Sequence, residues 1–559
     1  MSSGRHETMN TRRCVGGFSP VWVCAGVATM LAGCGSPLGS SDRDLGNRPP
    51  PERLRNIDRF PTEQYVKPPA PPSEAKVDDP SKAARDKFAA MPEIPMTIEE
   101  ARASALAHNL DLKVSLLNPT ITQESVTAEE AAFEAVFTTR ALWQETDAAT
   151  IPPFPGGHDR LYSVTPGVSI PLRTGGSASV NLPITRDENP ASALNPAWTT
   201  DLDFSISQPL LRGAGREVNA TAITIASYNQ QISEAQTKLA VIGQIAAIDR
   251  AYWRLYQARR DLDVRQQQYD LAQAQLEKAQ RLVNSGKRAE IEVVRAQSGV
   301  ADRLDGIIVA QNAVLRQQRE FKRLMNLPGL EVDNTSRLVT KTDPRPVEYL
   351  FNAQALSASA EQSRMEMMEL ELRLLADSAS IKFNKDQILP QLDLSASYAI
   401  KGLGDSWDSS RRMMQRNEFN DWSIGATLSM PLGNEAAQSR YRQSVLTRIQ
   451  RIGSRESRKQ TIKQEVYDAV DSIEAGWQRI LATRQATILS TRALQAEQRQ
   501  FEVGNSTSTN VLDAAARLAE AQLNEILAVT DYEVTQVNLA VATGTLLGAE
   551  KIRWEPSKP

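Results

Sequence analysis

Few side chains in this 559-residue chain could do chemistry, because it has only three cysteines and three histidines. His108 falls on a predicted helix, and His158 falls in a loop rich in proline and glycine. Neither histidine has a cysteine or carboxylate at the spacing that binds a metal. No nucleophile is paired with a base, and no phosphate-binding loop occurs. The sequence therefore predicts no catalytic residue, no metal site and no cofactor.

One cysteine has a predicted role, and it lies near the N-terminus. Three arginines precede an apolar run from Val15 to Leu31, which ends in Leu31-Ala32-Gly33-Cys34. A charged region, an apolar region and small residues at the cleavage point are typical of a signal peptide. Leu-Ala-Gly-Cys resembles the bacterial lipobox, which implies cleavage after residue 33 and lipidation (palmitate) of Cys34. A chance cysteine in an ordinary signal peptide is the alternative, and translation could start at Met1 or Met9.

Residues 34–95 are predicted to form a proline-rich, lipidated N-terminal tether. They contain the runs Pro49–Pro51, Pro68–Pro69 and Pro71–Pro72 and many charges without an apolar period. Such a segment cannot bury enough apolar surface to offset its ordering entropy. Gly35 follows the cysteine, where the sorting rule for lipoproteins needs an aspartate for inner-membrane retention, so the motif implies outer-membrane delivery.

The overall charge argues against a nucleic-acid partner. The chain has 64 lysines and arginines against 67 aspartates and glutamates, a net charge of -3. No large positive field is available to hold a polyanion. We therefore expect no nucleic-acid binding.

An apolar pattern of seven residues occurs twice, and this repeat predicts the helices. The pattern recurs at a constant offset of 218 residues, as follows: Ile248, Leu255, Leu262, Leu276 and Val283, then Val466, Ile473, Ile480, Leu494 and Phe501. Alanines at 251, 258, 272 and 279 form a second seam. A strict seven-residue spacing requires a left-handed supercoil with partner helices.

The chain therefore divides into two repeats, 96–330 and 331–549, followed by a tail at 550–559. Each repeat has an opening helix, strands, a long helix, a glycine turn and a returning helix. The strands are expected at about 133–209 and about 391–431, and the long helices at about 217–284 and about 434–503. Each long helix would be roughly 100 Å long at 1.5 Å per residue, far more than a globular domain accommodates.

Each long helix is expected to end in a glycine turn. The first turn contains Asn284, Ser285 and Gly286, and the second contains Val503, Gly504 and Asn505. Glycine supplies the positive φ that ends a helix and lets the chain reverse.

The strands have two unlike faces. In the second repeat, Leu392, Leu394 and Ala396 alternate with Asp393 and Ser395, and the returning strand follows the same pattern. Strands of nine or ten residues with one apolar face fit a bilayer and a wet lumen. Four such principal strands cannot close a barrel, so other copies of the chain would have to complete it.

The first repeat holds an additional hairpin at about 160–185, with Thr174-Gly175-Gly176 at its turn. Two placements remain open for it. It could extend the outer rim of the barrel or be part of the wall.

At their ends, the strands carry a recognisable motif. Phe204-Ser205-Ile206-Ser207-Gln208-Pro209-Leu210-Leu211 and Leu428-Ser429-Met430-Pro431-Leu432-Gly433 resemble the paired strand-to-helix motif of the TolC-like outer membrane factor (outer membrane efflux protein) family. Gln208, Pro209, Leu210, Pro431 and Leu432 are its residues here. Proline fits this position because it ends ladder pairing and fixes φ before the helix. The resemblance covers about residues 96–549.

The resemblance implies a mainly α fold with a β-barrel part. Long coiled-coil hairpins would form an α-barrel tunnel, and four strands per protomer would join in a homotrimer as a 12-stranded transmembrane β-barrel. It implies a bacterial outer-membrane protein of the lipoprotein subtype, in contact with outer membrane lipid and with a large periplasmic portion. Solutes would leave passively from an inner-membrane pump through a periplasmic adaptor (membrane fusion protein), in efflux or type I secretion. The chain would conduct and not catalyse.

In the family, acidic residues near the second turn line a constriction. Asp513 matches one such position, Asn510 departs from the expected carboxylate, and Glu292 is at the equivalent position of the first repeat. Three copies of Asp513 would form an anionic ring that attracts cations. A solvated aspartate on a helix face is the alternative. The two glycine turns are the expected adaptor contacts.

A second function class stays open, a periplasmic coiled-coil adaptor or scaffold lipoprotein. Adaptors have one hairpin beside a compact β domain, whereas this chain has two equivalent hairpins and strands of bilayer length. The cargo is not predicted: drugs, metals, glycolipids and a polypeptide all remain open, as does the identity of the pump.

Overall fold

The computed structural model describes residues 88–147, 158–189 and 192–552. The chain divides into two compact units, residues 1–78 and residues 79–559, and all of the described residues belong to the second. The predicted signal peptide, Cys34 and most of the predicted tether lie outside the described residues.

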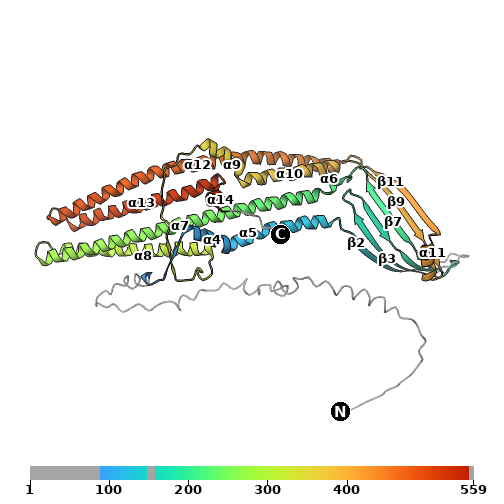
Figure 1. Cartoon of the computed structure of the whole chain (residues 1–559), viewed down its shortest axis with the longest axis horizontal. Helices are drawn as coiled ribbons and strands as arrows, with labels where there is room; N and C mark the ends of the chain where they lie inside the picture. The colour runs from blue at the N-terminus through green and yellow to red at the C-terminus, as the bar shows by residue number, and fades with distance from the viewer. Residues whose placement is uncertain (1–87, 148–157, 190–191, 553–559) are drawn as a thin grey trace, which may run out of the picture. The chain divides into compact units, whose positions relative to one another are not determined.

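The helices follow the predicted repeat (Figure 1). Their bounds in the first repeat are α4 (Ile98–His108), α5 (Leu110–Ala131), α6 (Arg216–Asn219), α7 (Thr221–Asn284) and α8 (Ile291–Met325). Those in the second are α9 (Ala353–Ser363), α10 (Met365–Asp386), α11 (Trp407–Arg416), α12 (Glu435–Glu502), α13 (Ser508–Ala542) and α14 (Leu546–Ala549). The long helices α7 and α12 begin and end within four residues of their predicted bounds. Among the described residues, no helix is both long and apolar enough to cross a membrane.

Both apolar seams of α7 are used within the chain. Ile248 and Leu255 of the seven-residue stripe are fully buried, and Ala251 and Ala272 of the alanine seam are 2% and 1% exposed. Helix α7 packs against α8 and α13 toward its turn and against α5 and α10 toward the strands. The small alanines permit the close approach that the sequence predicted.

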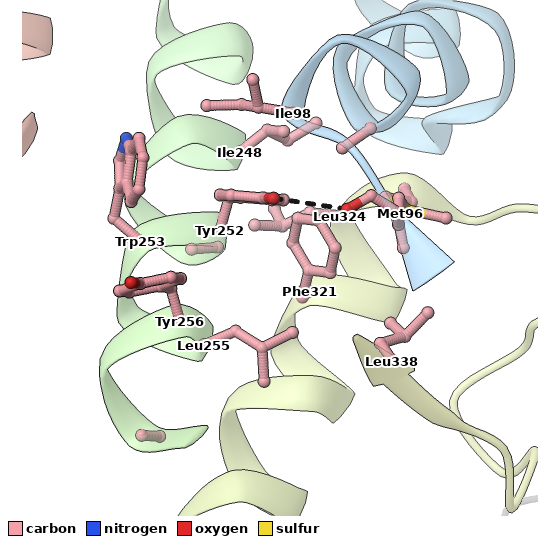
Figure 2. Close-up of a cluster of buried hydrophobic side chains, with 14 of the residues drawn as sticks. Met96, Ile98, Ile248, Tyr252, Trp253, Leu255, Tyr256, Phe321, Leu324 and Leu338 are labelled. Carbon is pink, nitrogen blue, oxygen red and sulfur yellow. Dashed lines mark hydrogen bonds between the residues drawn. The ribbon is translucent and has the colours of Figure 1, made fainter. Parts of the chain in front are cut away.

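The largest apolar cluster lies where α4, α7 and α8 meet (Figure 2). The Tyr252 ring packs edge-on against Phe321, with centroids 5.9 Å apart. Its hydroxyl donates to the Met96 carbonyl at 3.3 Å and accepts from the Thr342 N–H at 2.8 Å. The buried phenol is thereby satisfied while it ties both flanking segments to the long helix.

Ordered structure begins before residue 96, the predicted end of the tether. Phe88 is buried in the same cluster, and β1 (Glu93–Met96) pairs in parallel with β8 (Arg337–Thr340). Four residues that include a proline are too few to give a detectable period. The predicted boundary at 95 is therefore corrected to 88 or earlier.

The remaining strands form one nine-stranded sheet at the end of the long helices opposite the turns (Figure 1). Its members are β2 (Val136–Asp147), β3 (His158–Pro171), β4 (Ser177–Asn181), β5 (Ile184–Glu188), β6 (Ala197–Thr200), β7 (Leu202–Pro209), β9 (Gln391–Lys401), β10 (Leu403–Gly404) and β11 (Phe419–Ser429).

Three pairs of these strands are interrupted single strands. Strands β4 and β5 succeed one another along β3, and β6 and β7 do the same along β5 and β4. Likewise β9 and β10 continue one another along β7 and β6. The sheet therefore has six antiparallel rows in the order β2, β3, β4–β5, β6–β7, β9–β10, β11.

This count corrects the expected four strands per chain. The additional hairpin does not extend the rim, because its two rows lie between β2 and β7. Its alternation was too weak to count in the sequence, since β4 and β5 have five residues each and Leu182-Pro183 separates them.

Candidate functional site

The strands of the second repeat and β7 share two chemically distinct faces. Across β7, β9 and β11, Phe204 lies opposite Tyr398, and Tyr398 lies opposite Trp422. One residue along, Ser205, Ser397 and Ser423 form the corresponding row on the other face. One face can therefore meet lipid and the other can meet water.

The predicted strand-to-helix motif lies at the end of these strands. Leu210 N–H donates to the Leu392 carbonyl at 2.7 Å, which extends the ladder one residue past Pro209. The Gln208 side chain binds Thr174, with its Oε1 accepting from Oγ1 at 2.7 Å and its Nε2 donating to the carbonyl at 3.0 Å. The glutamine of the motif therefore holds the turn of the additional hairpin.

The second copy of the motif leaves the sheet differently. Pro431 is exposed and Leu432 is 95% exposed. The chain then turns through Gly433 and Asn434, at φ +90° and +46°, before α12 begins. Asn434 Nδ2 donates to the Ile388 carbonyl at 2.7 Å, which fastens this turn to the start of β9.

The two glycine turns have one geometry. Gly286 and Gly504 adopt φ +70° and +90°. In the first turn the Lys287 N–H donates to Leu282 O at 3.0 Å, and in the second the Asn505 N–H donates to Gln500 O at 2.9 Å. This is the Schellman arrangement, which satisfies the last carbonyls of a helix.

The turn residues are available to a partner. Asn284, Ser285, Val503 and Asn505 are all exposed, and Val503 is 73% exposed. An exposed valine at the tip of a polar turn is a contact residue without a contact in this chain.

Glu292 differs from the other two gate candidates because it is buried, at 7% exposure. Its Oε2 accepts from the Ser508 N–H at 3.1 Å, and its Oε1 accepts from Arg295 at 3.0 Å. It thus caps the N-terminus of α13, where a carboxylate is favoured. Within one copy Glu292 joins the two hairpins and does not present its charge to solvent.

Asp513 and Asn510 line a shallow groove of about 460 Å³ between α12 and α13. Both are exposed, and Asn510 Nδ2 donates to Ser506 Oγ at 3.2 Å. Asp513 makes no hydrogen bond or ion pair with any residue that the structure describes. A charge held exposed and unpaired at this end is consistent with a role outside the single chain.

Both flanks of the unit carry apolar stripes that the sequence reasoning missed. Helix α5 exposes Leu110, Val114, Leu117 and Ile121, and α12 exposes Leu446, Ile449 and Ile452. The same flanks end in β2 and β11, the rows with one unpaired edge. The spacing of three and four residues in α5 was a readable signal.

A buried ion pair was also missed. Asp249 of α7 is fully buried and accepts from Arg102 Nε at 2.7 Å, while Arg102 also pairs with Glu550. Burial raises the pKa of Asp249, and the nearby Arg102 opposes this. Farther along α7, burial raises the pKa of Asp261 to about 6. Neither carboxylate lies at a spacing that would have marked it in the sequence.

The two weighed histidines show no catalytic geometry. His108 Nδ1 lies 3.1 Å from the Ser104 carbonyl of its own helix. His158 begins β3 and faces Asp147 at 3.5 Å, so its predicted position in a loop was wrong. Within the described ranges, no three histidine, cysteine or acidic side chains could hold a metal ion.

Comparison with known proteins bears on this arrangement. Residues 356–545 match the family model described as "Outer membrane efflux protein". Over 314 residues the chain is 26% identical to the outer membrane protein TolC of Vibrio cholerae, covering 54% of this chain and 68% of the relative.

Solved structures share the fold over most of the chain. A membrane protein from Pseudomonas aeruginosa superposes with a TM-score of 0.62 at 16% identity, covering 80% of this chain and 93% of that one. The Campylobacter jejuni CmeC outer membrane channel gives 0.59 at 13% identity, covering 83% and 87%. The chain belongs to the outer membrane efflux protein family. In this family the paired hairpins and the sheet above them are the parts of a helical tunnel and a β-barrel, the fold class that the sequence predicted.

Proposed function

We propose that three copies of this chain close side by side into an outer-membrane channel, through which an inner-membrane pump passes its cargo to the exterior. One observation carries the proposal. Each copy has two incomplete flanks, and these flanks complement one another in chemistry and in height.

The helical flanks agree in height above the turns. Leu117 lies 131 − 117 = 14 residues before the end of α5 next to the strands. Ile449 lies 449 − 435 = 14 residues after the start of α12 next to the strands. The two helices run in opposite directions, so at 1.5 Å per residue both side chains lie about 21 Å from the sheet. The exposed stripes of α5 and α12 can therefore pack against each other between copies.

The sheet flanks agree in direction. Strand β2 follows α5 out of the helical part, and β11 runs back toward α12, so β2 of one copy and β11 of the next would be antiparallel. A bilayer leaves no water to satisfy an open edge. Closing both edges at once requires a ring of copies, and the number three is taken from the family resemblance.

The remaining parts then acquire roles. The exposed glycine turns would contact the periplasmic adaptor, and a ring of Asp513 with Asn510 would form the gate. Lipidation at Cys34 would add an anchor in the outer membrane. No residue of the channel performs catalysis in this scheme, and the pump selects the cargo.

A periplasmic adaptor or scaffold lipoprotein is the competing function. It is disfavoured because a water-soluble sheet would not expose the row Phe204, Tyr398 and Trp422 on one face.

The test combines assembly with conduction. The purified protein should remain trimeric in detergent and raise the conductance of a planar bilayer. Leu117→Glu buries a charge at the contact between copies and should abolish both. Thr120→Glu, an exposed position of α5 outside the stripe, should change neither. A protein that is monomeric in buffer without detergent and does not conduct would overturn the proposal.

A further inference from the structure

We infer that β3 and the β4–β5 row are membrane-spanning wall strands, so that each copy supplies six strands to the channel and the exit is wider than a four-strand copy would build. This rests on the proposed trimeric channel and concerns the size of cargo that its barrel admits.

The first support is the composition of the outward face. One register row crosses all six strands and carries an apolar or aromatic side chain on each: Phe137, Val168, Val180, Phe204, Tyr398 and Trp422. All six are exposed in the single chain, from 36% at Val168 to 72% at Trp422. The additional strands thus continue the lipid-compatible face without a break.

The opposite face gives the second support. The neighbouring row carries a serine on five successive strands: Ser169, Ser179, Ser205, Ser397 and Ser423. Hydroxyls of Ser179 and Ser205 lie 2.7 Å apart, and those of Ser397 and Ser423 lie 2.8 Å apart. The pair that joins the additional hairpin to β7 therefore has the same side-chain contact as the pair within the second repeat.

A second aromatic level lies six residues farther from the helices. There Trp143 lies opposite Tyr162, Tyr162 opposite Arg186, and Arg186 opposite Trp198. The Arg186 guanidinium lies 5.6 Å and 5.7 Å from the centroids of the two flanking rings. Six residues span about 20 Å of strand. Two aromatic rows at that separation match the girdles that bound the apolar band of a barrel.

The turn of the hairpin is fitted to its neighbours. A Cβ on Gly176 would lie 2.4 Å from the Ser207 carbonyl, and one on Gly175 would lie 2.1 Å from the Gly213 carbonyl. Together with the two bonds from Gln208 to Thr174, this contact seats the hairpin at the base of β7. A hairpin that merely covered the rim would not need backbone contact at its inner end.

The width follows from the strand count. Three copies of six strands give eighteen, and at about 4.8 Å spacing and a tilt of about 40° their circumference is about 113 Å. Twelve strands would give about 75 Å by the same estimate. Three copies contribute four helices each at any level of the tunnel, and twelve helices about 9–10 Å apart have a circumference of about 110–120 Å.

Eighteen strands therefore continue the tunnel at its own width, whereas twelve would narrow it. The exit then sets no size limit below that of the helical tunnel, and the limit lies at the gate beside the turns. Bulky cargo, with a cross-section near that of the tunnel, fits this exit.

A disulfide test separates the two walls. In six rows, Ser179→Cys with Ser205→Cys should form a disulfide in membranes. In four rows, β2 would pair with β7 in the register of β9 with β11, where Asp393 lies opposite Thr427, and this places Thr138 opposite Ser205. Thr138→Cys with Ser205→Cys is therefore the matched control. Free thiols are counted with a maleimide polymer, and the parental chain with Cys14, Cys24 and Cys34 gives the background.

We expect the first pair to be protected from the maleimide and the second to be labelled. The reverse result in a trimeric, conducting protein would overturn the six-row wall and leave the channel intact. A parental chain that forms no trimer would overturn both.

A second measurement does not depend on disulfides. Val168→Lys places a charge on the proposed lipid face, and Ser169→Lys places it on the proposed lumen face. We expect Val168→Lys to lower the yield of detergent-resistant trimer at least tenfold and Ser169→Lys to lower it less than twofold. Equal yields would mean that β3 lies outside the bilayer and would contradict the inference.

Discussion

The two repeats of this chain agree in their helices and differ in their strands. Helices α8 and α13 each have 35 residues, and α7 and α12 have 64 and 68. The junction residues also correspond: Asn109 Nδ2 donates to Leu324 O, and Arg364 Nη1 donates to Ala542 O, 218 residues later. In the sheet, however, the first repeat supplies four rows and the second supplies two.

The difference teaches which parts are held by a shared surface. The helices of both repeats must meet side by side over their whole length, so a change in one would misalign the other. The connection between two strands leaves the sheet at its far end, where added length meets no partner. Growth by a hairpin is therefore compatible with the repeat, whereas growth by a helical turn is not.

The largest difference in stability should separate the two junctions. Arg102→Ala leaves the fully buried Asp249 without its cation, and loss of one partner of a buried pair costs about 3–5 kcal/mol. Arg364→Ala should cost less, about 1.5–3 kcal/mol, because Glu366 and Glu465 keep contacts with Arg458. Denaturant unfolding of the two variants measures both values.

The pH dependence supplies the control for that pair. The pKa of Asp249 is raised, so the folded state tolerates the neutral carboxyl, and this contribution is lost as the pH rises. The penalty of Arg102→Ala should therefore shrink on going from neutral to mildly acidic pH. Equal penalties at both pH values, or equal penalties for both arginines, would contradict the assigned burial of Asp249.

The additional hairpin should be the most sensitive part of the sheet to a single methyl group. Gly176→Ala places a Cβ against the Ser207 backbone, and overpacking of this kind costs about 1–3 kcal/mol. Gly425→Ala in β11 is the control, because its Cβ would lie 3.3 Å from the rotatable Ser395 hydroxyl. The thermal midpoint of the assembled protein should fall for the first variant and change little for the second.

Each repeat holds its middle segment with a tyrosine, but from different helices. Tyr252 of α7 has two hydrogen-bond partners, whereas Tyr532 of α13 donates only to the Val347 carbonyl, at 2.5 Å, among the described residues. Tyr252→Phe leaves the Thr342 N–H unpaired and should cost about 1–2 kcal/mol, against about 0.5–1.5 kcal/mol for Tyr532→Phe. Chemical denaturation of the two variants tests this order, and a larger loss at Tyr532 would reverse the comparison.

The smallest effect concerns Asp261, which faces no acidic counterpart because position 479 of the second repeat is an arginine. Burial raises its pKa from 3.8 to about 6, so its favourable contribution is complete below pH 3.8 and is lost as the pH rises through about 6. Asp261→Asn should stabilise the protein above pH 6, by about 1 kcal/mol given its access to solvent, and have no effect near pH 4. A stabilisation that did not depend on pH would contradict the shift.

The sequence predicted the helical part nearly to the residue and the sheet only in part. A heptad that runs for ten turns or more is a long signal, and glycine with positive φ marks its end, as at Gly286 and Gly504. By contrast, β4 and β5 are five residues each and share a row only through their common neighbour β3. That relation exists in space and leaves no period in the chain.

The candidate site divides in the same way. The turns and the strand-to-helix motif were predicted because each depends on local backbone geometry, in particular glycine and proline. The burial of Glu292 against Ser508 was not predictable, since it depends on how the two hairpins meet. The apolar stripe of α5 was readable, but its meaning required the height of the matching stripe on α12.

The most direct test of the account is a cross-link between copies at equal height. In Leu117→Cys with Ile449→Cys, oxidation of outer membranes should give covalent dimers and a closed trimer on a denaturing gel, and Thr120→Cys with Ile449→Cys should give neither. Products confined to the monomer, or a ladder that continues beyond the trimer, would contradict the closure of three copies into one channel.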